Sequence, residues 1–155
     1  MKTSTLKLAL TIAMAALLQA CNDTDAPQKP SSFTIMQGTE AAPSTITVTE
    51  IHGTMPNQIL ICPLTIKNNT DSVILVDIKR EVITHVPGSI EFPYWGYTDL
   101  VVNDGEVTPK ASVFPGSSEP FTAKCYTKCN KGTNKIRYTV RHANETQAVE
   151  IIYIF

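Results

Sequence analysis

A two-residue period in hydrophobicity, which begins at Phe33 and continues to the end of the chain, limits the fold more than any other feature. Residues 58–67 and 135–142 show it most clearly. Their apolar side chains occupy every second position: Leu60, Cys62, Leu64 and Ile66 in the first segment, and Ile136, Tyr138 and Val140 in the second. Successive side chains of a β-strand point to opposite faces, so each segment predicts a strand with one buried face. No helical period follows the first 20 residues, and the sequence predicts an all-β fold.

Turn-forming residues separate these segments. Asn68-Asn69-Thr70-Asp71, Asn103-Asp104-Gly105 and Pro115-Gly116 contain the side chains that favour turns, because they accept left-handed backbone or preset φ. Further strands are expected over residues 33–36, 45–51, 72–80, 82–86, 98–102, 106–109, 120–125 and 147–155. Only the Asn-rich turn lies between 58–67 and 72–80, so we expect these two strands to form a hairpin.

About seven to nine short strands favour a two-sheet sandwich of the immunoglobulin or fibronectin type, because each half-apolar sheet must bury one face. The Gly132 turn followed by Ile136, Tyr138 and Val140 resembles the penultimate strand of such domains. We expect the Tyr138 ring in the core, with its hydroxyl bonded back to the preceding loop. Residues 147–155 are apolar on both faces, which predicts a central or covered strand, or an adhesive edge.

The first twenty residues have the pattern of a signal peptide, with Lys2 and Lys7 before a short apolar run. The run ends Leu18-Gln19-Ala20-Cys21, which resembles the lipobox of bacterial lipoproteins. This resemblance implies removal of residues 1–20 and attachment of acyl chains to Cys21, which would hold the protein on a membrane without spanning it.

Residues 21–32 are expected to form a flexible tether, and residues 33–155 the sandwich domain. Asp23 and Asp25, just behind Cys21, resemble the export signal that sends lipoproteins of Bacteroides-type bacteria to the outer face of the outer membrane. The expected location is the cell envelope, most simply the outer membrane. The sequence leaves open whether the domain faces the surface or the periplasm.

Four further segments resemble small secreted Bacteroides-type sandwich proteins. They are "LTIKNNTDSVILVDIKR", "FPYWG", "VFPGSSEPFTAKCYTK" and "GTNKIRYTV". The resemblance implies an immunoglobulin-like fold and no established chemistry. Pro93 and Tyr94 stand where that family has a cysteine, so a disulfide at this element is not implied for this chain.

Lipidation of Cys21 would leave three cysteines in an oxidising compartment, Cys62, Cys125 and Cys129. A bridge between Cys125 and Cys129 is the first candidate, and it requires the chain to curl between them. A core bridge between Cys62 and Cys125, or no bridge, are the alternatives. No histidine lies at metal-ligand spacing from these cysteines, so no metal site is predicted.

The segment Phe92-Pro93-Tyr94-Trp95-Gly96-Tyr97 is the candidate binding element, because aromatic faces stack on sugar rings and anchor protein interfaces. We interpret it as a loop and take Tyr94, Trp95 and Tyr97 as candidate ligand-binding residues. The alternative places Trp95, the only tryptophan, in the core. Asp71-Ser72-Val73 resembles the O-glycosylation acceptor of Bacteroides-type bacteria, which makes Ser72 a candidate modification site.

Six basic residues lie in a span without Asp or Glu, in a chain whose formal net charge is −1: Lys124, Lys128, Lys131, Lys135, Arg137 and Arg141. They form either a docking surface for an anionic partner or outward strand positions in different sheets. Nothing in the charge suggests binding to nucleic acid.

No catalytic motif is recognisable, and no catalytic residue or cofactor is predicted. The sequence favours a lipid-anchored envelope protein with a non-catalytic binding or adhesion-type domain. Its partners would be the membrane, through the lipid anchor, and a glycan or an envelope or host protein. A periplasm-facing structural or assembly lipoprotein is the alternative, followed by a small secreted hydrolase.

Overall fold

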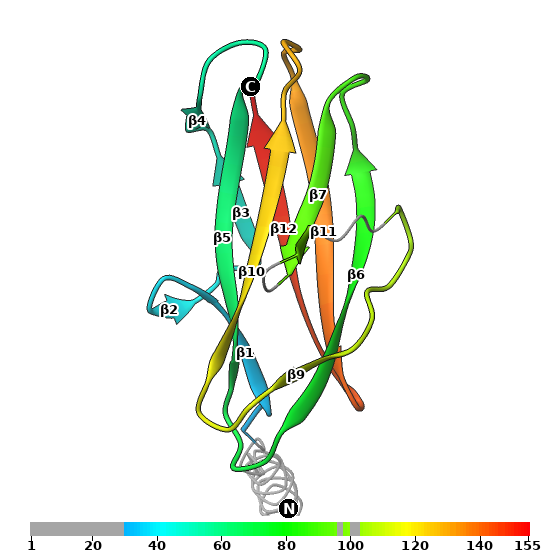
Figure 1. Cartoon of the computed structure of the whole chain (residues 1–155). Coiled ribbons are helices and arrows are strands. Elements are labelled where there is room, and N and C mark those ends of the chain that lie inside the picture. Colours follow the sequence, from blue (N-terminus) through cyan, green and yellow to red (C-terminus); the bar gives the residue numbers. More distant parts are fainter. Residues whose placement is uncertain (1–29, 96–97, 100–102) are drawn as a thin grey trace, which may run out of the picture. The chain divides into compact units, whose positions relative to one another are not determined.

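The computed structural model describes residues 30–95, 98–99 and 103–155, and residues Ser31–Phe155 form one compact unit built from two β-sheets (Figure 1). The seven-stranded sheet has the order β2-β1-β5-β10-β7-β8, with β4 also paired to β5. Its strands are β1 (Phe33–Gln37), β2 (Glu40–Ala41), β4 (Ile51–His52), β5 (Ile59–Asn68), β7 (Ile90–Trp95), β8 (Thr98–Asp99) and β10 (Ser118–Tyr126). The five-stranded sheet has the order β3-β12-β11-β6-β9. Its strands are β3 (Thr45–Val48), β6 (Ile74–Thr84), β9 (Ala111–Val113), β11 (Thr133–His142) and β12 (Glu145–Ile154).

The predicted all-β sandwich is confirmed. Among the described residues, eight strands are four or more residues long, which agrees with the expected seven to nine. The alternating positions meet between the sheets and form one core. Its largest fully buried side chains include Phe33, Leu60, Leu64, Ile66, Ile78, Phe121, Ile136, Tyr138, Ile151 and Tyr153.

The final strand, β12, lies between β11 and β3, so the prediction of a central strand is confirmed. It pairs antiparallel with β11 and parallel with β3. On one face of β12, Val149, Ile151 and Tyr153 point into the core. On the other face, the residues between them lie half-exposed on the outside of the sheet.

The predicted hairpin of 58–67 with 72–80 is wrong, because β5 and β6 belong to different sheets. The turn after Asn68 carries the chain across the sandwich, and β5 pairs with β10 and β1 instead. Alternation of apolar residues shows which face of a strand is buried. The inner faces of the two sheets bury the same kind of residue, so alternation does not show which strands pair with each other.

Other expected strands also differ from the structure. The segment 45–51 divides into β3 and β4, which lie in separate sheets. The strands expected at 72–80 and 82–86 form the single strand β6, opposite a register irregularity at Lys135 and Ile136. Residues 106–109 contribute only an isolated bridge, between Val107 and Lys79.

Two prolines mark where strands of the larger sheet lack a second neighbour. Pro63 lies in β5 between the residues that pair with β4 and those that pair with β1. Pro120 pairs with β5 just before the residues of β10 that pair with β7. A proline has no N–H to donate, so it is tolerated where one edge of the strand needs no partner.

The entry of the chain into β1, the β5–β6 connection and the β9–β10 connection lie at one end of the sandwich (Figure 1). The chain enters β1 at Phe33, which pairs with Asn68 at the end of β5. Ser118 at the start of β10 pairs with Lys67, next to Asn68. Ile74 at the start of β6 pairs with Val113 at the end of β9. Ile90 and Tyr126 pair at the opposite end. We refer to the end at which the chain enters β1 as the β1 end.

Candidate binding face and buried polar network

The neighbouring strands β7 and β10 display aromatic and cationic side chains on the outer face of the larger sheet. The inward positions of β10 are Phe121, Ala123 and Cys125, all fully buried. The alternate positions therefore point outward, and they include Lys124 and Tyr126. Phe92 and Tyr94 are the half-buried outward positions of β7.

These outward side chains contact one another in pairs. The rings of Phe92 and Tyr126 are stacked, with centroids 5.5 Å apart and planes at 18°. The ammonium of Lys124 lies 4.3 Å from the centroid of the Tyr94 ring, and that of Lys128 lies 5.5 Å from the Tyr126 ring. Cations at these distances are attracted by the negative face of an aromatic ring. We call these five residues the aromatic–lysine face.

The aromatic–lysine face combines two recognition chemistries. Its rings offer broad apolar surfaces edged by a phenol hydroxyl, a surface on which the C–H face of a sugar can pack. Its lysines supply positive charge that would meet a carboxylate or sulfate. The outward positions of β5 opposite β10 are Ile61, Pro63, Thr65 and Lys67, and none of them is acidic. On the β5 side, the face therefore carries no carboxylate; on the other side, Asp99 of β8 pairs in register with Tyr94.

The three predicted ligand-binding residues have different outcomes. Tyr94 lies on the aromatic–lysine face. Trp95 is 8% exposed and packs on Phe121 with ring centroids 6.2 Å apart, so the core alternative was correct and Trp95 is not available as a surface contact. Tyr97 lies outside the described residues. The interpretation of 92–95 as a loop is wrong, because these residues lie in β7.

Sequence reasoning missed Phe92, Lys124 and Tyr126 as a group. The signal was the alternation within β7, which places Phe92 and Tyr94 on one face of the strand and Trp95 on the other. Once 90–95 is assigned as a strand, that alternation separates the outward rings from the core ring.

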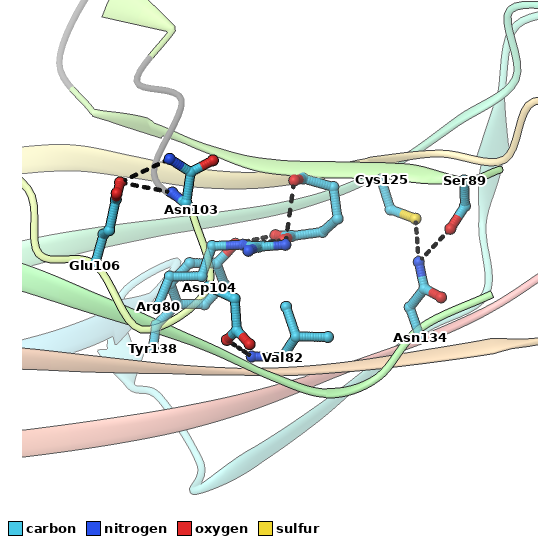
Figure 2. Close-up of polar contacts among 10 residues, drawn as sticks. Arg80, Val82, Ser89, Asn103, Asp104, Glu106, Cys125, Asn134 and Tyr138 are labelled. Carbon is cyan, nitrogen blue, oxygen red and sulfur yellow. Dashed lines mark hydrogen bonds and ion pairs between the residues drawn. The ribbon is translucent and has the colours of Figure 1, made fainter. Parts of the chain in front are cut away.

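A polar network crosses the core between the two sheets (Figure 2). Glu91, on an inward position of β7, accepts from Arg80 of β6, with Nε and Oε2 2.7 Å apart. The Tyr138 hydroxyl of β11 donates to the other carboxylate oxygen of Glu91. The Tyr138 ring is fully buried, as predicted, but the predicted bond of its hydroxyl to the preceding loop is wrong. Its acceptor is Glu91, an inward position of β7 in the other sheet.

Burial controls the protonation of this carboxyl group. Loss of solvent raises the pKa of Glu91 to about 7, although the positive charge and the hydrogen bond of Arg80 act in the opposite direction. Arg80, Glu91, His85, Asn103 and Asp104 help to line a cleft of about 280 Å³ at the surface. The network is thus buried with one side near solvent, and its Arg80–Glu91 contact is an ion pair above about pH 7 and a hydrogen bond to a neutral carboxyl group below it.

A second polar group lies beside Cys125 (Figure 2). The amide of Asn134, itself fully buried, donates to the Cys125 sulfur at 3.3 Å and to the Ser89 hydroxyl at 2.9 Å. Its oxygen accepts the backbone N–H of Val86 at 2.6 Å. These bonds join β11 to β10 and to the connection before β7.

The expected disulfides are not formed, and Cys62, Cys125 and Cys129 are free thiols. Cys125 points into the core, whereas Cys129 is exposed in the following turn at φ 65°. Cys62 pairs in register with Ala123, so Cys125 is only its diagonal neighbour. Diagonal Cβ atoms lie about 7 Å apart, beyond the roughly 4 Å that a disulfide requires. Burial raises the pKa of Cys62 and of Cys125 to about 12, which keeps both thiols protonated.

The basic span does not form one docking surface. Lys135 and Arg137 both pair with Glu150 on the outer face of the smaller sheet, at 2.6 and 2.5 Å. Arg141 pairs with Asp77 at 2.6 Å. Lys124 lies on the other sheet, so the interpretation as outward strand positions in different sheets is the correct one.

The remaining candidates concern modification. Ser72 is exposed in the connection between β5 and β6, where a modifying enzyme could reach it. Cys21 lies outside the described residues. Within the described ranges, no group of three or more His, Cys, Asp or Glu side chains is arranged to hold a metal ion. The same ranges contain no helix of the length and apolarity needed to cross a membrane.

No family of known proteins matches the sequence of this chain. No curated protein is similar to it in sequence either. Solved structures are similar in fold. One is the N-terminal domain of PorA, with a TM-score of 0.63 and 14% identity, covering 79% of this chain and 96% of that chain. Another is the CooA pilin subunit from enterotoxigenic Escherichia coli, with a TM-score of 0.51 and 9% identity, covering 80% and 98%. At these identities the likeness shows the immunoglobulin-like sandwich fold.

Proposed function

We propose that this protein is a lipid-anchored component of the bacterial cell envelope whose sandwich is a non-catalytic binding domain. The observation that supports binding is the aromatic–lysine face, on which stacked rings and lysines lie on rigid strands. A site on paired strands needs little ordering when a ligand arrives, so its contacts contribute more fully to affinity. The anchor is supported by the lipobox-like sequence that ends at Cys21.

The proposed ligand is a carbohydrate, and an acidic one fits best. The ring of Tyr94 and the stacked pair Phe92 and Tyr126 supply the platforms. Lys124 and Lys128 supply charge for a carboxylate or sulfate on the sugar. A protein ligand would also use aromatic anchors, so the test includes both kinds.

Binding of the mature domain to immobilised polysaccharides, some neutral and some rich in uronic acid or sulfate, tests the proposal. Tyr94→Ala and Tyr126→Ala should each weaken binding about tenfold or more, since truncating an aromatic side chain that anchors a ligand typically costs about 2 kcal/mol. Lys124→Ala should weaken binding to the acidic polymers more than to the neutral ones. Lys110→Ala, an exposed lysine outside the face, is the matched control. Equal binding by all variants would contradict the assignment of this face.

The anchor has a separate test. Cys21→Ser should move the protein from the membrane fraction to the soluble fraction of cells, because the thiol that receives the acyl chains is lost. Retention of the Cys21→Ser variant on membranes would contradict lipidation. This result is independent of carbohydrate binding.

A structural role in an envelope assembly is the second candidate. It is favoured by the similarity to a pilin subunit, which extends over 98% of that chain. Crosslinking in intact cells followed by purification distinguishes the two candidates. A stoichiometric protein partner, together with no polysaccharide binding, would support assembly.

A further inference from the structure

Three exposed apolar side chains lie together at the β1 end. Val73, Leu75 and Phe114 are 49%, 49% and 60% exposed. Val73 and Phe114 flank the buried pair formed by Ile74 and Val113, on the side opposite the core. We call Val73, Leu75 and Phe114 the apolar tip.

Exposure alone does not distinguish these residues, because Met55 and Ile90 at the opposite end are also exposed. What distinguishes the apolar tip is its position beside the point where the chain enters the domain. The backbone N–H of Asn69 donates to the carbonyl of Ser32 at 2.9 Å, and the Asn69 amide reaches the carbonyl of Ser31 at 3.2 Å.

The same end is held as a unit by Asn68. Its side-chain amide donates to the carbonyl of Ser72 at 2.8 Å and to that of Val113 at 2.9 Å. Both acceptors directly precede a residue of the apolar tip, Val73 and Phe114. The tip is therefore fixed to Ser31 and Ser32, through which the chain enters β1.

The segment between Cys21 and Ser31 is short. Fully extended it spans at most about 35 Å, and as a flexible chain about 18 Å on average. A ten-residue strand of the sandwich is about 33 Å long, which is more than the average span of this segment. On average, the β1 end is therefore nearer to an anchoring bilayer than the opposite end is. Among the exposed apolar residues, those of the apolar tip therefore lie nearest to such a bilayer.

The surroundings of the tip also suit a lipid surface. Lys110 and Arg141 line a hollow of about 300 Å³ next to Leu75. Asp77, in the same hollow, is already paired with Arg141. Lys110 can extend its charge to phosphate groups while its methylene stem lies along apolar surface.

We propose that the apolar tip rests in the interfacial layer of the bilayer to which Cys21 is anchored, so that the sandwich stands on its β1 end. The aromatic–lysine face then lies on the side of the domain, near the end that is far from the membrane. This inference rests on the proposed lipid anchor and adds the orientation of the domain.

Tryptophan fluorescence of the lipidated full-length protein in phosphatidylcholine vesicles tests the orientation. Phe114→Trp should add emission that is shifted to the blue and is quenched at least twofold by brominated acyl chains. Val73→Trp should behave in the same way and is the second reporter. Ile90→Trp, at the opposite end, is the matched control and should not be quenched. Trp95 is buried in every variant, so its emission is a constant background.

The outcomes separate this inference from the proposed function. Water-like, unquenched emission at both tip positions in acylated, vesicle-bound protein would overturn the orientation and leave the anchor intact. A Cys21 peptide without acyl chains by mass spectrometry would overturn the anchor and the orientation together. A glycan on Ser72 in protein from cells would also overturn the orientation, because it would hold Val73 away from the lipid. Greater quenching of Phe114→Trp in vesicles with added anionic lipid would support a contact of Lys110 with phosphate.

Discussion

Two tyrosine hydroxyls lie fully buried in the core, and they differ in their hydrogen bonds. The hydroxyl of Tyr138 donates to Glu91, whereas that of Tyr153 has no hydrogen-bond partner among the described residues. Tyr138→Phe should therefore lower the free energy of unfolding by about 1.5–3 kcal/mol, because it removes a bond to a buried carboxyl group. Tyr153→Phe should leave it unchanged or raise it by about 1 kcal/mol, because the lost hydroxyl was unpaired. Urea unfolding of the two variants, which make the same chemical change, is the measurement; equal losses would contradict the difference.

The raised pKa of Glu91 makes a prediction about pH. The folded protein keeps the proton on Glu91 up to about pH 7, whereas the unfolded chain releases it near 4.5. Between these values the folded state binds more protons, so stability falls as pH rises, by up to about 3 kcal/mol, and this contribution levels off about one pH unit above 7. Urea unfolding at pH 5, 6 and 7 checks the slope.

Glu91→Gln is the control for this slope, because glutamine has the same shape and does not titrate. The variant should lose most of the pH dependence between 5 and 7, whatever its absolute stability. A slope as steep as in the unchanged protein would place its origin in another group. Glu150 does not account for it, because Lys135 and Arg137 lower the pKa of Glu150, which produces the opposite trend at lower pH.

At the scale of elements, β1 is held on both edges. One edge pairs with β5. The other pairs with β2 at Met36 and Gln37, and nearer the start of β1 it meets the side chain of Gln147 on β12. The Gln147 amide donates to the carbonyl of Phe33 at 2.6 Å and accepts from the N–H of Ile35 at 3.2 Å. A single side chain thus bonds two backbone groups of β1 and closes the sandwich along this side.

Gln147→Ala should cost about 1–3 kcal/mol of stability, because the Ile35 N–H loses its partner and the Phe33 carbonyl keeps only the Ser31 hydroxyl. Gln37→Ala, at the exposed end of the same strand, should cost less than about 0.5 kcal/mol. Hydrogen exchange is the sharper measurement: the Ile35 amide should exchange faster in Gln147→Ala alone. Unchanged protection would mean that the β5 ladder suffices to hold β1.

The sequence predicted the long strands and their buried faces well, because alternation within β5 and β11 follows directly from burial on one side. It predicted pairing poorly. The turn after Asn68 has the residues of a hairpin, yet the same residues also suit a crossing between sheets, which is what Asn68 stabilises with its buried amide. Strand partners depend on how whole faces match, and single segments do not contain that information.

The candidate site was predicted in part for a related reason. Tyr94 and Trp95 were singled out by residue type, and the structure separates them by parity within β7. Pro93 and Gly96 favoured a loop, although one proline removes only a single donor from a strand. Phe92 meets Tyr126 only because β7 and β10 pair, and the two residues are far apart in the sequence. The Arg80, Glu91 and Tyr138 network requires both sheets for the same reason.

At the scale of the whole molecule, the proposed function predicts where the domain lies. A binding domain for polysaccharides outside the cell should be digested when intact cells are treated with protease, while a periplasmic control protein stays intact. Digestion of the domain only after the outer membrane is opened would contradict surface exposure. It would make the assembly role the leading proposal.

The attachment of β1 also has a mechanical consequence. If the lipid anchor holds Ser31 and a ligand holds the outer face of β10, a pull between them runs along the strand axes. The hydrogen bonds between β1 and β5 lie across that axis, so they are loaded together in shear and do not open one after another. The bonds of Gln147 to Phe33 and Ile35 share the same load. With the proposed anchor and ligand in place, β1 would transmit force between the membrane and the ligand on the outer face of β10.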